Sequence, residues 1–245
     1  MIRAPSSAAP HRSLAGFELF DGIKASEREV LERRCAWRSW PAGAMAVGHE
    51  TTGASVHFVV AGRCRVVARM PRGKRTVVLD EIGPGGFFGE IAAIDREPRS
   101  AAVTALVRTH TAELDGETFM QFIADHPVAA LRVMRRLTEV IRQADTAILE
   151  LSGLDAQARI YTELLRRARS GGSLPPNVGM IAPVPRHSEI AARAATARET
   201  VARVLGTLAR KQLLSRESER LLITDVRALT RMVGASEADA RETVA

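Results

Sequence analysis

The chain has 245 residues, 46% of them hydrophobic, and its 35 basic and 28 acidic side chains give a net charge of +7. This length allows one large or two small domains with a sizeable core. Its two cysteines, Cys35 and Cys64, lie far apart and lack metal-ligand spacing, which argues against a disulfide scaffold and favours a reducing, cytoplasmic setting. Because no run of about 18 apolar residues occurs, we expect no membrane span.

The first 13 residues, rich in Ala, Pro and Ser, contain no apolar signal core, and we expect them to be disordered. β-rich segments follow, with glycines in the gaps where turns require positive φ. The expected strands cover 37–40, 56–60, 64–68, 75–79, 101–107 and 110–114, and the glycines are Gly43, Gly53, Gly62 and Gly73. Short strands at regular spacing predict a small antiparallel β-roll, which we place at residues 14–126.

Residues 86–103 of this roll combine groups suited to a phosphate and a sugar. The segment 91–94 predicts a short helical turn, whose free backbone N–H groups, from Glu90 onward, favour an anion. Arg99 supplies a planar fork of donors for a phosphate, and Glu90 offers an acceptor to a sugar hydroxyl. Gly89 allows the backbone to come close. The candidate ligand contacts here are Gly89, Glu90, Ile91, Arg99 and Ser100. Singly, such fragments are common surface features.

A long helix is expected over residues 127–152. Apolar or small residues recur along it in steps of four and three, at Ala130, Met134, Leu137, Ile141, Ala144, Ile148 and Leu151. This heptad seam favours a parallel helix partner, and therefore a homodimer. The alternative is an amphipathic helix that packs on its own roll.

The positive charge is concentrated after this helix. Residues 1–155 contain 20 basic and 19 acidic side chains, whereas residues 156–220 contain 12 and 5. A basic module on a near-neutral body suits binding to double-stranded DNA, because its cations displace counterions from the phosphates. A merely solvated basic surface is the alternative.

Residues 155–233 predict a winged helix-turn-helix. The expected elements are a helix capped by Asp155 and running to about Arg169, a loop over 170–179, helices over 188–195 and 196–205, and a two-stranded wing over 213–224. The two short helices are expected to cross closely through an inner face of small and apolar residues. That face consists of Ile190, Ala191, Ala194, Val201, Val204 and Leu205.

The second short helix carries charged side chains on its outer face. The candidate DNA contacts are Arg198, Glu199 and Arg203, toward base edges, with Thr200 and His187 as weaker candidates for the DNA backbone. Arginine pairs bidentately with guanine, and glutamate accepts from cytosine N4. Glu199 has a competing role, because it could close a capping box with Thr196.

Several spaced motifs resemble the cyclic-AMP receptor protein/FNR family of bacterial transcription regulators over residues 15–233. These motifs are Pro41–Gly43, Phe58–Gly62, Gly85–Glu90, Arg99–Ala101 and the C-terminal module. The resemblance implies an allosteric cyclic nucleotide at Gly89, Glu90, Arg99 and Ser100, a homodimer and palindromic half-sites of the TGTGA type. RNA polymerase is a further implied partner. Where the family often has glycine between the two short helices, this chain has Ala195, for which we expect helical or bridging φ.

The motifs do not determine whether the base of the nucleotide is adenine or guanine. The family's adenine contact, a Thr-Ser pair, falls on Ala144 and Asp145, with Thr146 next, so it is not reproduced. Asp145 could accept from guanine N1–H and N2–H₂ or from adenine N6, or it could lie exposed without a role. The resemblance favours cyclic AMP, with cyclic GMP as the alternative. A vestigial pocket or another metabolite ligand is the third possibility.

The sequence thus predicts an α+β regulator with a β-roll, a dimerisation helix and a winged helix-turn-helix. An enzyme is not expected, because the six histidines show neither metal-ligand pairing nor a nucleophile–base set, and no metal or resident cofactor is predicted. A nonspecific architectural DNA binder would not need the charged set on the second short helix. We also expect Arg99 to lack a partner until the nucleotide binds, reaches Asp145 or Thr146 and rotates the winged modules about Gly153.

Overall fold

The computed structural model describes residues 12–69, 76–169 and 176–242, with side chains up to residue 235. The chain forms two compact units. The first comprises residues up to 69 and 78–140, and the second comprises residues 70–77 and 141 onward. The long helix α4 (Pro127–Gly153) contributes to both.

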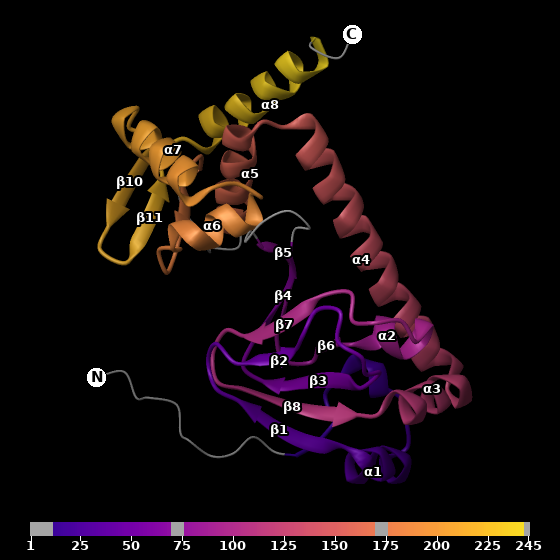
Figure 1. The fold of residues 1–245 in the computed structure, drawn as a ribbon. Coiled ribbons are helices and arrows are strands. Elements are labelled where there is room, and N and C mark those ends of the chain that lie inside the picture. Colours follow the sequence, from indigo (N-terminus) through magenta and orange to yellow (C-terminus); the bar gives the residue numbers. More distant parts are fainter. Residues whose placement is uncertain (1–11, 70–75, 170–175, 243–245) are drawn as a thin grey trace. The chain divides into compact units, whose positions relative to one another are not determined.

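The first unit is a roll of two four-stranded sheets (Figure 1). One sheet has the order β1-β8-β3-β6, formed by Ala36–Trp40, Thr109–Leu114, Val56–Ala61 and Phe87–Phe88. The other has the order β2-β7-β4-β5, formed by Met45–Val47, Ala102–Ala105, Cys64–Arg69 and Thr76–Ile82. The expected strands and their antiparallel pairing are confirmed, and β2 and β6 are additions that the sequence pattern did not indicate.

Short helices complete this unit: η1 (Glu18–Phe20), α1 (Ala25–Arg34), α2 (Glu90–Asp95) and α3 (Gly116–Asp125). The helical turn expected at 91–94 is α2. The sequence pattern did not predict α1 or α3. For α3 a signal existed, because Asp115 is a good N-cap and accepts a hydrogen bond from the Thr118 N–H at 2.8 Å.

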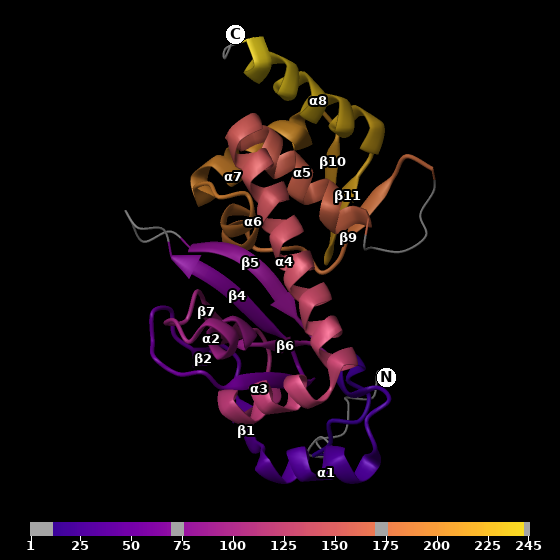
Figure 2. The ribbon, with the colours of Figure 1, turned by 90° about the vertical axis from the view of Figure 1, so that its right-hand side faces the viewer.

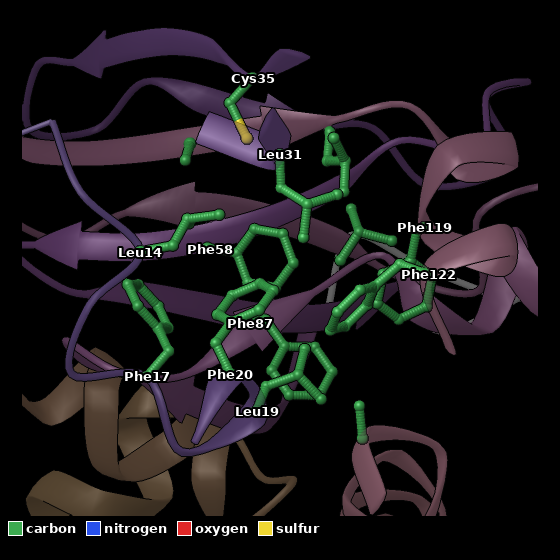
Figure 3. Packing of buried hydrophobic residues seen from close by; sticks show 14 of the residues in the cluster. Leu14, Phe17, Leu19, Phe20, Leu31, Cys35, Phe58, Phe87, Phe119 and Phe122 are labelled. Atoms are coloured by element: carbon green, nitrogen blue, oxygen red, sulfur yellow. The ribbon is translucent and has the colours of Figure 1, made fainter. Parts of the chain in front are cut away.

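Aromatic side chains fill the centre of the roll (Figure 3). Phe58 on β3 is fully buried, and the rings of Phe17, Phe20 and Phe119 surround it at centroid distances of 5.7, 5.2 and 6.5 Å. Such tilted and edge-to-face contacts add to the stabilisation from apolar burial. The N-terminal segment is therefore part of the core from Leu14 onward.

The expectation of disorder is wrong for Ser13, whose hydroxyl donates to the Glu32 carboxylate at 2.9 Å. Residues 1–11 of that tail lie outside the described residues. The expected turn glycines Gly43, Gly53 and Gly62 have positive φ, whereas Gly73 lies outside the described residues. At Gly62 a Cβ atom would lie 2.5 Å from the Arg108 carbonyl oxygen, so no larger residue fits.

Helix α4 changes its surroundings along its length. In its first half, Ala129 and Val133 are buried and Leu137 packs against the aromatic core, so this half does pack on its own roll. From Ile141 to Leu149 every residue is exposed in the single chain. Of the expected seam, Met134, Ile141 and Ile148 are each about 60% exposed. Packing on its own roll is therefore confirmed for the first half, Leu137 included, and the dimer seam stays a prediction for the exposed second half.

The second unit contains α5 (Ala156–Arg169), α6 (His187–Arg193), α7 (Arg198–Arg210) and α8 (Val226–Glu242), with the sheet β10-β11-β9 (Figure 2). Its strands are Leu214–Glu217, Arg220–Ile223 and Gly179–Ile181. The predicted N-cap is confirmed, since Asp155 accepts from the Ala158 N–H at 2.7 Å. The two-stranded wing is confirmed as β10 and β11.

Four features of this unit differ from expectation. Strand β9 occupies the end of the expected loop, of which residues 170–175 lie outside the described residues, and α8 extends beyond residue 233. Helix α7 begins at Arg198 and not at Thr196. The expectation for Ala195 is wrong: its φ of +46° lies in the left-handed region, where a Cβ atom is unfavourable.

Candidate functional site

Arg99 lies in the loop between α2 and β7 and is 5% exposed. Its Nη1 donates to the Gly89 carbonyl at 3.0 Å, and its Nη2 donates to the carbonyl and hydroxyl oxygens of Ser55 at 2.8 and 3.1 Å. The expectation that Arg99 lacks a partner in the absence of nucleotide is therefore wrong. A buried guanidinium is costly without acceptors, and backbone carbonyls supply them here.

Gly89 makes this arrangement possible. It is the N-cap of α2 with φ +94°, and a Cβ atom there would lie 2.5 Å from the Ser55 carbonyl oxygen and 2.6 Å from Arg99 Nη1. Only glycine combines this backbone conformation with that close approach. Ile91 is half-buried in the first turn of α2, and Ser100 is exposed beside Arg99.

Glu90 is the first residue of α2 and is 5% exposed. Burial raises the pKa of its carboxyl, and the positive charges of Arg136 and Arg99 partly oppose that rise. Arg136 reaches this region from α4, where it forms an ion pair with Asp80 on β5. Gly89, Glu90, Arg99 and α4 are thus brought together in the first unit, as a site for a phosphate and a sugar hydroxyl requires.

A polar cluster beside Arg99 was missed by the sequence analysis. Ser55, His57 and Glu113 line a cavity of about 510 Å³ together with Arg99 and the loop Thr51–Gly53. Their distant positions in the chain left no local pattern, since Ser55 precedes Arg99 by 44 residues.

His57 is the least exposed member of this cluster, at 3%. Its ring stacks on Phe88 with a centroid distance of 4.9 Å, and its Nε2 lies 3.3 Å from the Ser55 hydroxyl. Burial lowers the pKa of His57 to about 4, so the ring is neutral at pH 7. Glu113 is ion-paired with Arg38 at 2.8 Å, and hydrogen bonds from Arg38 and Ser55 lower its pKa.

Asp145 and Thr146 belong to the second unit, where both are exposed on α4. The Thr146 hydroxyl donates to the Arg142 carbonyl at 2.8 Å. Their contact with a nucleotide stays a prediction.

The expected DNA contacts lie on the outer face of α7. Arg198, Glu199 and Arg203 are exposed, and within the described residues their side chains form no hydrogen bond or ion pair. Val201, Val204 and Leu208 are buried on the opposite face. Thr200 and His187 are half-buried, the latter at the start of α6.

The capping box between Thr196 and Glu199, the alternative role for Glu199, is not formed. Ala197 is the N-cap of α7 and its side chain makes no capping bond. A reciprocal carboxylate is found instead in α6, where Glu189 accepts from the Arg186 N–H at 2.9 Å. Glu199 therefore remains free on the surface.

A buried carboxylate fixes the helices that carry this face. Glu163 on α5 is 2% exposed and pairs with Arg166 at 2.8 Å and Arg167 at 2.7 Å, with Arg193 on α6 at 3.9 Å. Arg166 also bonds Glu150, near the end of α4, at 2.7 Å. These charges neutralise part of the basic module internally, whereas Arg198 and Arg203 form no ion pair among the described residues.

In the described ranges no three His, Cys, Asp or Glu side chains gather as a metal site. Both cysteines are free and buried, and burial raises the pKa of Cys35 to about 12. Among the helices of these ranges, none combines the length and apolarity that a membrane crossing demands.

Comparisons with known proteins agree with both units. Residues 37–126 match the cyclic nucleotide-binding domain, and residues 158–232 match the Crp-like helix-turn-helix domain. Together these domains define a transcription regulator that binds a cyclic nucleotide and DNA; it is not an enzyme.

Relatives extend this agreement over most of the chain. The cyclic AMP receptor protein of Thermus thermophilus is 32% identical over 80% of this chain and 87% of its own. A CRP-like cAMP-activated global transcriptional regulator of Mycobacterium tuberculosis is 24% identical over 89% of this chain and 97% of its own. The chain belongs to the cyclic-AMP receptor protein/FNR family.

Solved structures share the fold. A CooA mutant from Carboxydothermus hydrogenoformans superposes with a TM-score of 0.70 at 22% identity, covering 84% of this chain and 90% of that one. The regulator CLP of Xanthomonas campestris gives the same TM-score at 21% identity, with 82% and 99% covered. The α+β prediction, with its roll, long helix and winged helix-turn-helix, is confirmed.

Proposed function

We propose that the protein is a homodimeric regulator whose binding to palindromic DNA is controlled by cyclic AMP at Arg99. The observation that carries the proposal is the buried guanidinium held beside Gly89 and Glu90, at the start of α2. A cyclic phosphate replaces part of the acceptor set of Arg99, while Glu90 accepts from the ribose hydroxyl. The proposal includes a cytoplasmic setting and RNA polymerase as a further partner.

Cyclic AMP is favoured because the Mycobacterium tuberculosis relative is described as cAMP-activated. Cyclic GMP is the alternative, and it is supported by Asp145, whose exposed carboxylate has two acceptors suited to guanine N1–H and N2–H₂. The substitution Asp145→Asn distinguishes between cyclic AMP and cyclic GMP as the ligand. The change is expected to weaken cyclic GMP binding and to leave cyclic AMP binding within about twofold.

The exposed stripe on α4 supports the dimer. Met134, Ile141, Ile148 and Leu151 are 47–61% exposed and lie at heptad spacing on one helix. Apolar side chains in this spacing gain stability when a second helix covers them. Two copies joined there carry two α7 helices, as a palindrome of TGTGA-type half-sites requires.

The same proposal gives the ligand its effect on DNA. The nucleotide contacts α4 at Asp145 or Thr146, stiffens the seam and turns the winged modules about Gly153, the last residue of α4. The ligand shifts this equilibrium only by binding the DNA-competent form more tightly.

Calorimetric titration with cyclic AMP and cyclic GMP tests the pocket. Wild-type protein is expected to bind one of them at micromolar affinity or tighter, and Arg99→Leu is expected to lose this binding. The matched control is Arg108→Leu, at an exposed arginine of the same unit. Anisotropy of a labelled TGTGA palindrome, with and without nucleotide, reads out control of DNA binding.

Two results contradict the proposal in different ways. Retained nucleotide binding in Arg99→Leu places the pocket elsewhere. Equal DNA affinity with and without nucleotide means that the pocket is vestigial and that the regulator acts without this ligand.

A further inference from the structure

We infer that Ser55 sets the affinity of the Arg99 site by competing with the ligand for the guanidinium. The inference rests on the proposed function in one respect, that the anion at Arg99 is a cyclic phosphate. Ser55 directly precedes β3 and lies outside the motif at 86–103.

The argument begins with the geometry of the guanidinium. Its five N–H groups present two pairs to an oxyanion, Nε with Nη2 and Nη1 with Nη2. Both pairs include Nη2, which carries one hydrogen on each side. Bidentate binding of a phosphate therefore needs a free hydrogen on Nη2.

In this structure Ser55 engages Nη2 twice. Its carbonyl oxygen lies 2.8 Å and its hydroxyl oxygen 3.1 Å from that nitrogen, while Gly89 accepts from Nη1. Two acceptors of Ser55 thus compete with a phosphate for Nη2, the nitrogen that both bidentate pairs include. A phosphate must first displace one of the two contacts, and the longer one, to the hydroxyl, is the weaker.

The neighbours of the Ser55 hydroxyl hold it toward Arg99. Its oxygen lies 3.3 Å from His57 Nε2 and 3.1 Å from Arg99 Nη2. His57 is itself fixed by its stack on Phe88. Glu113 lies on β8 opposite His57, and Ser55 is among the groups that lower the pKa of its carboxyl. The hydroxyl therefore sits between Arg99 and a fixed ring.

The same cavity supplies a matched control. Thr52 also lines the space of about 510 Å³ beside Arg99, and within the described residues its hydroxyl forms no hydrogen bond. Removing it changes the polarity of the cavity without touching the guanidinium.

The test compares wild type, Ser55→Ala, Ser55→Thr and Thr52→Ala by calorimetric titration with cyclic AMP, cyclic GMP and inorganic phosphate. Ser55→Ala removes the hydroxyl acceptor from Nη2, and its ligand affinity is expected to rise about tenfold, the low end for a hydrogen bond from a charged group because the contact is long. Ser55→Thr keeps the hydroxyl and the wild-type affinity. Thr52→Ala also keeps the wild-type affinity.

Thermal unfolding separates competition from a merely structural role. Ser55→Ala removes a partner of Arg99 and the contact with His57, so its midpoint is expected to fall while its affinity rises. A purely structural residue lowers both quantities together, and that result overturns the inference.

The remaining outcomes distinguish this inference from the proposed function. If neither nucleotide binds but Ser55→Ala binds inorganic phosphate more tightly than wild type, the role of Ser55 stands and the cyclic nucleotide is the wrong ligand. Unchanged or weaker binding of every probe in Ser55→Ala, including no binding at all, refutes the competition.

Discussion

Two regions of this protein present arginine to a proposed phosphate-bearing partner. They differ in whether the guanidinium is buried and bonded by the protein or exposed to water. Arg99 is 5% exposed and already bonded to Gly89 and Ser55. Arg198 and Arg203 are exposed, and among the described residues they have no partner. The difference follows from solvation, because water solvates an exposed guanidinium, whereas a buried one needs acceptors from the protein.

This contrast has a functional consequence. Ligand binding at Arg99 is an exchange of partners, and its affinity depends on how well the internal acceptors compete. Binding of DNA at α7 begins from solvated charges, so its affinity depends mainly on salt and on fit to the groove. Substitutions in the first region should therefore change stability and binding together, and those in the second should change binding alone.

The largest expected effect is that of Gly89→Ala. A Cβ atom at 2.5 Å from the Ser55 carbonyl, on a backbone with φ +94°, should lower the free energy of unfolding by about 3 kcal/mol and abolish nucleotide binding. Gly85→Ala is the control, because its φ is +86° but no atom lies within 4 Å. It should cost about 1 kcal/mol in chemical denaturation, from backbone strain alone. Equal losses in the two variants contradict the close approach at Gly89.

His57 makes the stability of the same region depend on pH. Its pKa is lowered from 6.5 to about 4. Between these pH values the imidazole is protonated in the unfolded chain and neutral in the folded chain. Stability is therefore present above pH 6.5 and falls as the pH drops toward 4, by about 3 kcal/mol. Guanidinium unfolding at pH 7 and pH 4 measures this loss. It should be much smaller in His57→Phe, which keeps a ring against Phe88, and unchanged in His49→Gln.

Arg198→Ala tests the exposed region. It should weaken binding to a TGTGA palindrome by about 2 kcal/mol, roughly 30-fold, and leave the thermal midpoint unchanged. Arg210→Ala is the control at the other end of α7, where the arginine is exposed and bonds only Thr207 in the described chain. A fall in the midpoint of Arg198→Ala contradicts the view that this charge has no internal partner.

The smallest effect concerns the turn that orients α7. Ala195 has φ +46°, and Ala195→Gly should stabilise the protein by about 0.5 kcal/mol, the strain relieved minus the added freedom of the unfolded chain. Ala194→Gly, with φ −82° and a buried side chain, should destabilise it instead. Chemical denaturation distinguishes the two signs.

Much of the fold could be predicted from local patterns. Glycines between β-rich segments predicted the strands, and the apolar spacing predicted α4. The alanines predicted the close crossing of α6 and α7. The sequence pattern did not predict helix α1, because this helix buries only Leu31 and therefore shows little apolar periodicity. Helix α8 begins after a recognisable cap, Asp225, which accepts from the Ala228 N–H at 2.8 Å, but it follows the wing over 213–224, the last element that the sequence pattern predicted.

The candidate site was predictable only in part. Gly89, Glu90 and Arg99 lie in one short segment, and their chemistry, their spacing and the family resemblance together predict them as ligand contacts. Ser55, His57 and Glu113 reach Arg99 through pairing of β3 with β8 and the packing of the two sheets, which no local pattern encodes. For the same reason the partners of Arg99 in the absence of ligand could not be foreseen, nor could the positive φ of Ala195.

Helix α4 couples two kinds of equilibrium. Its first half is buried by its own chain, a unimolecular reaction that dilution does not affect. In the proposed dimer, the apolar side chains from Ile141 to Leu151 are covered only by another copy. The stability of that half therefore depends on the protein concentration. Dilution is then a selective perturbation: it loosens the seam while the aromatic core and the Arg99 cluster stay folded.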